Sequence, residues 1–274
     1  MSKIINKNKR ANSRLDFKSI DIFTKSKRSQ VTIFIILALI LVVSIALIYV
    51  VIRKPTISIS PEDNPQAYIE KCARDYVKEA LDILMPQGSY IEPRNYKLYK
   101  DVKVGYLCYT REFYETCKNQ EPMLIEHIEK EVIGYIEPRM QNCFSNLRRE
   151  LEKKNYDIDM QSMNISVEIK PEKVFITINR KLQLIKNEQT RNYETFKAQI
   201  LSPIYELSVI ALKIMNGESV GCGYDYVNEM MLYSNYDIKK FVTGDSTKIY
   251  TLKDKISQQE LKFAIRSCVV PPGL

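Results

Sequence analysis

The chain has no tryptophan, one histidine and only eight glycines among its 274 residues. A lone histidine cannot build a zinc site from several imidazoles, and no two cysteines have the C-x-x-C spacing of structural zinc sites. The sequence also lacks a glycine-rich phosphate loop and a G-x-S-x-G segment. The histidine, His127, lies in a helical segment beside Glu126 and Glu129, so we interpret it as a solvated helix residue. We therefore predict no catalytic residue, no metal and no cofactor.

One long stretch lacks charge altogether. Residues 31–52 form 22 consecutive uncharged residues, and as a helix they would extend about 33 Å, enough for a hydrocarbon core of about 30 Å. The stretch is longer than the apolar part of a secretory signal peptide, and no small-x-small cleavage site precedes Arg53. We therefore predict a transmembrane signal-anchor helix at 31–52.

Charge predicts the orientation of this anchor. Residues 1–30 hold nine basic and two acidic residues, whereas residues 55–274 hold 30 basic and 31 acidic residues. The positive-inside rule then makes 1–30 a basic cytoplasmic tail and places 64–274 outside the cell membrane, after a linker at 53–63. The sequence pI of about 9.0 reflects that tail. It gives no reason to expect a nucleic-acid partner.

All six cysteines lie beyond the anchor, where an oxidising compartment would preserve disulfides. Six cysteines allow fifteen pairings, and the sequence does not choose among them. The spacing nevertheless suggests candidate pairs. Cys108 and Cys117 flank a short loop, and Cys72 and Cys143 lie on the apolar faces of separate helices. Cys222 and Cys268 then remain as the third pair by elimination. A tight turn beside a disulfide explains Gly221-Cys222-Gly223 better than a reactive thiol.

Two long amphipathic helices are expected in the outer domain. The first should begin near Asn64, with Pro65 as its first helical residue, and end at Gln87-Gly88. The second covers 122–153, where Pro138 should kink or split it. Between them lies a tyrosine-rich segment in which Val102, Val104 and Tyr106 alternate, typical of a half-buried strand face rather than a binding surface.

The rest of the domain mixes strands with shorter helices. Apolar residues alternate at 165–169 and 174–178, and a third run follows the polar segment KNEQTRN, which predicts an antiparallel meander with one solvated face. Ser202-Pro203 should begin a helix that runs to Gly217. A helix at 225–233 and strands near 236–242, 247–252 and 261–270 complete the chain. The fold class is therefore α+β: a transmembrane helix followed by an extracytoplasmic domain with two long amphipathic helices and antiparallel β meanders.

Two modification sites stand out. KRSQ before the apolar stretch resembles the archaeal class III, pilin-like signal, which implies a cut between Ser29 and Gln30. The fifth position after that cut, usually glutamate, is Phe34 here, so this chain departs from the pattern. Asn164 begins the sequence N-I-S, an N-glycosylation acceptor, within a predicted strand.

Four segments carry a wider resemblance: YIEKCARDYVKEALDILMPQGSYIEP, IEKEVIGYIEPRMQNCFSNLRRE, NISVEIKPEKVFITINRKLQL and LKFAIRSC. They are similar to segments of a group of uncharacterised archaeal membrane-anchored proteins, which share a basic start, a pilin-like apolar helix, a YIE-x-C helix ending in QGG-Y, and a later helix with a second cysteine. This chain differs in having Gly88-Ser89 in place of two glycines, and in the additional Cys108 and Cys117. The resemblance covers most of 25–270. It implies an archaeal surface origin and no particular activity.

Three functional hypotheses follow. The first is a non-enzymatic single-pass membrane protein, held in the lipid bilayer, whose outer domain binds or assembles with an unknown envelope or surface protein. The second is a pilin-like subunit, which Pro55 argues against because it would break the continuing helix. The third is an envelope hydrolase using unidentified carboxylates, although acidic pairs such as Asp225 and Glu229 are expected by chance among 31 acids. No nucleic acid and no small-molecule substrate is identified.

Overall fold

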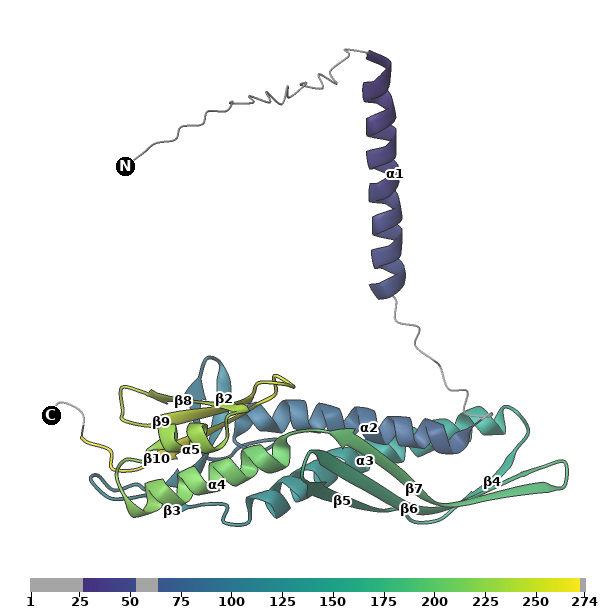
Figure 1. Cartoon of the computed structure of the whole chain (residues 1–274). Coiled ribbons are helices and arrows are strands. Elements are labelled where there is room, and N and C mark those ends of the chain that lie inside the picture. Colours follow the sequence, from purple (N-terminus) through teal and green to yellow (C-terminus); the bar gives the residue numbers. More distant parts are fainter. Residues whose placement is uncertain (1–26, 53–63, 272–274) are drawn as a thin grey trace, which may run out of the picture. The chain divides into compact units, whose positions relative to one another are not determined.

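The computed structural model describes residues 27–52 and 64–271, and within the first range it describes side chains only for 33–48. The chain divides into two units, residues 1–58 and residues 59–274 (Figure 1). The predicted linker at 53–63 lies outside the described residues, as does the predicted cytoplasmic tail up to residue 26. Ser29 and Gln30, the predicted processing site, fall where only the backbone is described.

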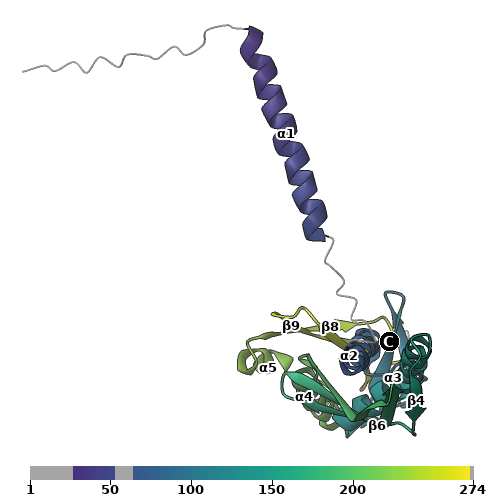
Figure 2. The ribbon, with the colours of Figure 1, turned by 90° about the vertical axis from the view of Figure 1, so that its right-hand side faces the viewer.

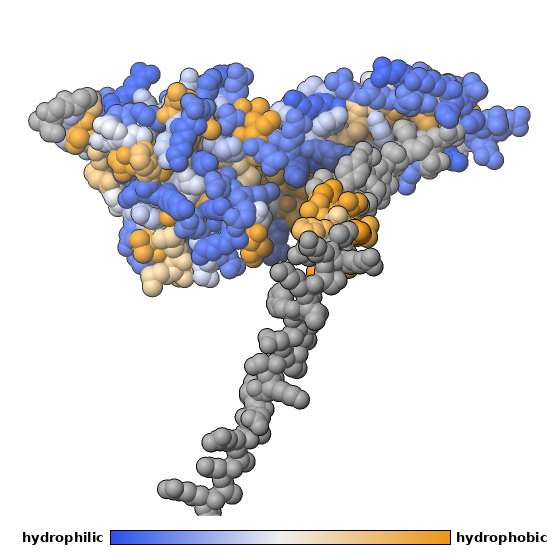
Figure 3. Space-filling model, turned by 90° about the horizontal axis from the view of Figure 1, so that it is seen from above, coloured by the Kyte–Doolittle hydropathy of each residue, from blue (hydrophilic) through white to orange (hydrophobic). Residues whose placement is uncertain are grey.

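The first unit contains helix α1 (Lys27–Ile52). Its described side chains are all exposed and are apolar apart from Ser44; seen end-on in Figure 3, they form a hydrophobic group. The Ser44 hydroxyl donates to the Ile40 carbonyl at 2.7 Å, so its hydrogen bond is made within the helix. Across the described residues, no helix has both the length and the hydrophobicity needed to cross a membrane. The predicted span at 31–52 extends past the described side chains at both ends.

The second unit is a mixed α+β domain, as predicted. Its helical elements are α2 (Pro65–Leu84), the 3-10 turn η1 (Met85–Gln87), α3 (Leu124–Glu152), α4 (Ile204–Val220) and α5 (Tyr226–Leu232). Its strands are β1 (Tyr96–Tyr99), β2 (Val102–Tyr109), β3 (Lys118–Asn119), β4 (Asp157–Met160), β5 (Asn164–Lys170), β6 (Lys173–Lys186), β7 (Gln189–Leu201), β8 (Tyr236–Val242), β9 (Lys248–Asp254) and β10 (Glu260–Arg266).

The ends of α2 follow from local chemistry. The Asn64 side chain accepts a hydrogen bond from the Ala67 N–H at 2.9 Å, and Pro65 occupies the first helical turn. After η1, Gly88 adopts φ 76°, a left-handed conformation that glycine reaches without strain. Both predicted boundaries are confirmed.

Helix α3 runs unbroken through Pro138, so the predicted split is wrong. Proline removes one backbone hydrogen bond to the carbonyl four residues earlier, which belongs to Gly134. Both Pro138 and Gly134 are exposed, so water can bond that carbonyl. The other face of the helix is buried along its length and holds the two halves together.

Strands β4–β7 form an antiparallel sheet centred on β6, with β7 along one side and β5 and β4 along the other. Strand β5 alternates exposed and buried residues, which confirms the meander with one solvated face. The expected seven-residue turn after β6 is wrong: Lys186 pairs with Gln189, which leaves only Asn187 and Glu188, both at positive φ. Such a two-residue turn matches the twist of the paired strands. The polar residues that follow it therefore continue the antiparallel pairing of β6 with β7.

The other sheet has the order β1-β2-β10-β9-β8, and β3 pairs with β2. Only the β2–β10 pair is parallel among the described strands. The two edge strands approach each other: the rings of Tyr99 and Phe241 lie 5.2 Å apart, and Lys97 Nζ lies 2.6 Å from Asp245 Oδ2. The sheet therefore curls around a small apolar cluster of Val104, Tyr106, Ile249 and Ala264. The strand over Val102, Val104 and Tyr106 is confirmed, but the half-buried face is wrong, because β2 is buried on both faces from Val104 to Cys108.

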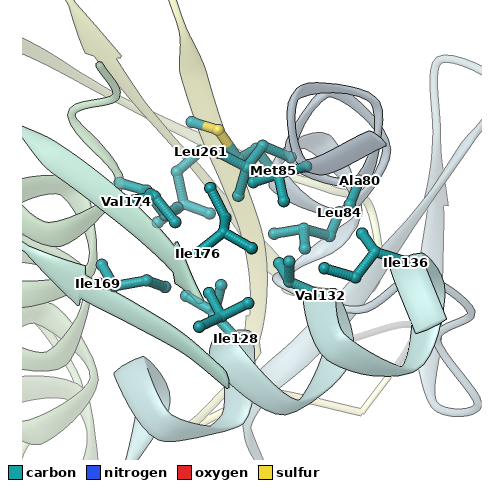
Figure 4. Packing of buried hydrophobic residues seen from close by; sticks show 14 of the residues in the cluster. Ala80, Leu84, Met85, Ile128, Val132, Ile136, Ile169, Val174, Ile176 and Leu261 are labelled. Carbon is teal, nitrogen blue, oxygen red and sulfur yellow. The ribbon is translucent and has the colours of Figure 1, made fainter. Parts of the chain in front are cut away.

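A single main core joins the two sheets. Helices α2 and α3 lie side by side against β7 and β5, and α4 contacts both sheets (Figures 1 and 2). In Figure 4, Leu84 and Val132 from the helices meet Ile176 from one sheet and Leu261 from the other. Because the same side chains support both sheets, we expect the domain to unfold as one unit.

All six cysteines form disulfides, which confirms the prediction of disulfide bonds. Cys72–Cys143 joins α2 to α3, Cys108–Cys117 closes the loop before β3, and Cys222–Cys268 ties the end of α4 to the segment after β10. These are the three candidate pairs that the spacing suggested. Gly221-Cys222-Gly223 accordingly lies beside a disulfide.

The ion pair that closes the curled sheet should weaken in acid. Burial raises the pKa of Asp245, but hydrogen bonds from Lys97 and Thr243 outweigh it and lower that pKa to about 2. An aspartate with a depressed pKa stabilises the fold above its unfolded value of about 3.9, and this contribution is lost as pH falls from about 4 towards 2. Because Asp245 is half exposed, Asp245→Asn should cost less than about 1 kcal/mol. Hydrogen exchange should show faster exchange in β1 at pH 6 in this variant, and equal exchange would contradict the role.

Candidate binding cavity

A cavity of about 750 Å³ opens where the loop after α2 crosses strand β2 and the start of α3. Its size falls in the range of ligand pockets, about 300–1,000 Å³. Its lining comes from the loop, β2, the segment after β3 and α3: Tyr90, Ile91, Glu92, Pro93, Arg94, Asn95, Lys103, Tyr106, Gln120, Glu121 and Glu131. We call it the Tyr90 cavity.

Two glycines allow the loop to lie directly on the strand. Gly88 has φ 76°, and a Cβ there would come within 2.7 Å of the Gly105 carbonyl oxygen. A Cβ on Gly105 would lie 2.7 Å from the Tyr90 ring and 2.9 Å from the Gln87 carbonyl oxygen. The neighbouring Ser89 is also at positive φ, 70°, and is fully buried. The loop conformation that presents Tyr90 is therefore fixed by backbone contact.

This contact gives a stability prediction. Gly105→Ala should lower the free energy of unfolding by about 2 kcal/mol, because the added methyl overpacks Tyr90 and a backbone oxygen. Gly134→Ala, on the exposed face of α3 with no atom within 4 Å of the new Cβ, is the matched control and should be neutral or stabilising. Urea unfolding of both variants measures the difference. Equal midpoints would show that the loop gives way freely.

Three polar side chains form a connected network beside the cavity. The Tyr90 hydroxyl donates to Glu121 Oε1 at 2.8 Å, and Glu121 Oε2 lies 3.5 Å from His127 Nδ1. The other ring nitrogen, Nε2, donates to the Ser89 carbonyl at 3.0 Å, and the His127 and Tyr90 rings meet edge to face. Burial, followed by the hydrogen bond to Glu121, raises the pKa of Tyr90. Tyr90 therefore stays protonated and holds Glu121 in place.

The interpretation of His127 as a solvated helix residue is wrong. Its side chain is only 15% exposed, and both ring nitrogens face oxygen acceptors. Helical periodicity could not reveal this, because the groups that cover the ring come from Ser89 and Tyr90 on another element. His127 is a partly buried link between α3 and the loop that forms the cavity.

The cavity has both charges and a slight excess of acid. Glu131 Oε2 accepts a hydrogen bond from the Ile91 N–H at 2.7 Å, which anchors the loop to α3. With Glu92 the lining holds three carboxylates, against the two cations Arg94 and Lys103. A carboxylate offers about four acceptor positions, so Glu131 and Glu121 keep capacity for a ligand. Such a lining suits a polar, cationic group.

Two other carboxylates are structural. Asp225 caps α5 by accepting from the Val227 N–H at 3.1 Å. Glu229 is buried and accepts from the Tyr224 hydroxyl at 2.6 Å, with Lys213 Nζ at 3.5 Å. Asp225 and Glu229 are therefore engaged in structural contacts, and their helical spacing does not form a catalytic site.

The structure places the remaining predicted site residue on the surface. Asn164 is the first residue of β5 and is exposed. Within the described residues, no three His, Cys, Asp or Glu side chains are arranged to hold a metal ion.

The Tyr90 cavity escaped sequence reasoning. One signal was the tyrosine-rich segment, which holds Tyr90 and Tyr106 and which we interpreted as a strand face rather than a binding surface. The other was the pair His127 and Glu131, one helical turn apart, with Glu121 just before the helix. The spacing of His127 and Glu131 is common on solvated helices and does not by itself predict a cavity. The cavity forms because the loop after α2 packs on Gly105, which no spacing in the sequence reveals.

Comparison with models of protein families, with curated proteins and with solved structures finds no match to this chain.

Proposed function

We propose that this chain is a non-enzymatic single-pass membrane protein, with residues 1–30 in the cytoplasm and residues 64–274 forming an extracytoplasmic binding domain. Its proposed partner is another envelope protein, which inserts a polar segment carrying a basic side chain into the Tyr90 cavity. The observation that carries this proposal is the pairing of all six cysteines in three disulfides, since such bonds persist in oxidising compartments.

Membrane anchoring is supported by the sequence of α1. The charge-free residues 31–52 are long enough to span a bilayer, and the basic residues concentrate before them. The described part of α1 shows only apolar exposed side chains besides Ser44, which suits contact with lipid. The resemblance to archaeal membrane-anchored proteins supports the same proposal.

The chemistry of the cavity favours binding over catalysis. Glu121 and Glu131 each hold a structural donor, Tyr90 and the Ile91 N–H, so both are fixed acceptors. A partner lysine or arginine could pair with them and stack on the tyrosine rings. The presence of three carboxylates in the lining of one cavity is nevertheless the observation that favours an envelope hydrolase as the second candidate.

Topology is tested by the intact mass of the full chain extracted from its membrane, with and without reduction before alkylation. We expect release only with detergent, and six thiols that alkylate only after reduction. A chain beginning at Gln30 would instead support the pilin-like alternative. Thiols that are free without reduction would overturn the extracytoplasmic placement.

Partner binding is tested by replacing Glu92 with a photo-crosslinking amino acid, because this residue is exposed at the rim of the cavity. In native membranes we expect one defined cross-linked protein. Glu131→Gln should reduce that cross-link at least fivefold, whereas Glu126→Gln, at an exposed position on the same helix, should leave it unchanged. If both variants cross-link like the parent, the cavity is not the binding site.

A further inference from the structure

The charged residues of the Tyr90 cavity are segregated by structural element. Glu131 lies on α3, and Glu121 lies in the segment just before that helix. The two cations come from the β1–β2 hairpin: Arg94 lies two residues before β1, and Lys103 lies within β2. Glu92 lies on the loop that connects the two sides. The cavity therefore has an acidic side at the helix and a basic side at the hairpin.

The loop 91–95 runs from the acidic side to the basic side. Its first residue, Ile91, donates its backbone N–H to Glu131 at 2.7 Å, and the carbonyl of Asn95 accepts from the Tyr106 N–H at 3.0 Å. A fully extended chain from 91 to 95 reaches at most about 14 Å, so the two anchoring points lie no farther apart than that. Because the charged side chains line the cavity between these points, one residue with a long side chain can contact both sides.

The basic side is the one whose charges lack partners. The acids Glu121 and Glu131 each hold a donor of the protein itself, as described above. Within the part of the chain that the structure describes, Arg94 makes no hydrogen bond or ion pair, and Lys103 lies over the Tyr96 ring at 5.0 Å without a carboxylate partner. A guanidinium group offers a planar fork of donors that matches a carboxylate. The basic side is therefore suited to an anionic group of the ligand.

A basic side chain alone does not satisfy this arrangement. It would pair with the acids, but it would leave Arg94 and Lys103 without an anion and would bring a further positive charge near them. The last residue of a polypeptide carries an α-carboxylate, which an internal residue lacks. When that last residue is lysine or arginine, it carries the cation and the anion together, and both sides of the cavity are paired.

We propose that the Tyr90 cavity binds the C-terminal residue of its partner, and that this residue is lysine or arginine. Its side chain pairs with Glu131, and its α-carboxylate pairs with Arg94 and Lys103. This inference rests on the proposed function, because it specifies which part of the partner enters the cavity. The volume of about 750 Å³ lies in the upper part of the range for ligand pockets, so it suits the last few residues of a chain rather than one free amino acid.

The α-carboxylate is tested without changing the protein. A fluorescein-labelled peptide of glycine and serine that ends in lysine is titrated with the full-length chain in nanodiscs of neutral lipid, and binding is followed by fluorescence anisotropy. We expect the free acid to bind at least about tenfold more tightly than the same peptide with a C-terminal amide, because only the free acid pairs with the basic side. Equal affinities of the two peptides would overturn the proposal.

Matched variants assign the carboxylate to its position. Arg94→Gln should weaken binding of the free-acid peptide at least about fivefold and leave binding of the amide unchanged, because the variant and the amide remove the same interaction. Arg111→Gln, at an exposed position outside the cavity lining, should change neither. Since Arg94 is exposed and has no partner among the described residues, its replacement should not disturb the fold. An equal loss for both peptides would overturn the pairing of the carboxylate with Arg94.

Free lysine distinguishes the end of a chain from a small molecule. Displacement of the labelled peptide by free lysine at equal concentration would overturn the chain end as the ligand, in favour of a free amino acid. If neither peptide binds while the cross-link at Glu92 still depends on Glu131, the C-terminal inference fails and the proposed function stands. If the cross-link is also unaffected by Glu131→Gln, the proposed function fails with it.

Discussion

Removal of the Cys72–Cys143 disulfide should lower the free energy of unfolding by about 4 kcal/mol. This bridge joins α2 to α3 across 71 residues of sequence, and the chain-entropy cost of closing so long a loop in the unfolded state accounts for that figure. The double variant Cys72→Ser with Cys143→Ser is compared with the parent by urea unfolding. The bridge should matter most at the helix pair, because Cys143 is buried on the face of α3 that faces the core.

The Cys108–Cys117 bridge provides the matched control. It closes a loop across only 9 residues, so its removal should cost about 2.5 kcal/mol by the same relation. If removal of the short bridge lowered the free energy of unfolding as much as removal of the long one, the stabilisation would not come from loop entropy. It would point instead to lost packing, since Cys108 and Cys117 are both buried.

Loss of the Glu218 carboxylate should be comparably damaging. Glu218 is fully buried in α4; it accepts a hydrogen bond from the Tyr250 hydroxyl at 2.6 Å and pairs with the ammonium group of Lys248. Glu218→Ala leaves both partners without the carboxylate in a buried site, which typically costs about 3–5 kcal/mol. Thermal or urea unfolding measures the loss.

A triple variant separates the polar network from the packing. Glu218→Leu with Lys248→Met and Tyr250→Phe replaces the carboxylate and both of its partners by apolar side chains of similar size, and its stability should lie within about 1 kcal/mol of the parent. A triple variant as unstable as Glu218→Ala would show that this network, which also includes a hydrogen bond from Lys248 to the Cys222 carbonyl at 2.8 Å, contributes stability of its own.

Most secondary structure was predictable because it depends on neighbours in the sequence. The start of α2 at Asn64, the alternation in β5 and the end of the helical segment at Gly88 are local effects, and each was expected. The errors arose where solvent exposure decides the outcome. Pro138 does not break α3 because the Gly134 carbonyl that it leaves unpaired lies on an exposed part of the helix. The β6–β7 turn is short because Asn187 and Glu188 both adopt positive φ.

The candidate sites could not be predicted in the same way. His127, Glu121 and Tyr90 come from three segments, and nothing in their spacing shows that the loop folds back onto Gly105. The small apolar cluster of Val104, Tyr106, Ile249 and Ala264 likewise is enclosed only because β1 and β8, far apart in the sequence, close on each other. Polar surface residues carry no periodic signal, so their convergence is invisible until the strands are placed.

The amino-acid sequence by itself determined the α+β class, the charge-free residues 31–52, the basic start and the positions of the main helices and strands. These features depend on composition and on periodicities of two or about 3.6 residues, which are local properties of the sequence. Tertiary structure alone decided which polar groups share a cavity, that His127 is covered, and that both sheets rest on one core. The physical reason is that contacts between distant segments depend on how the whole chain excludes water, and no local pattern encodes that arrangement.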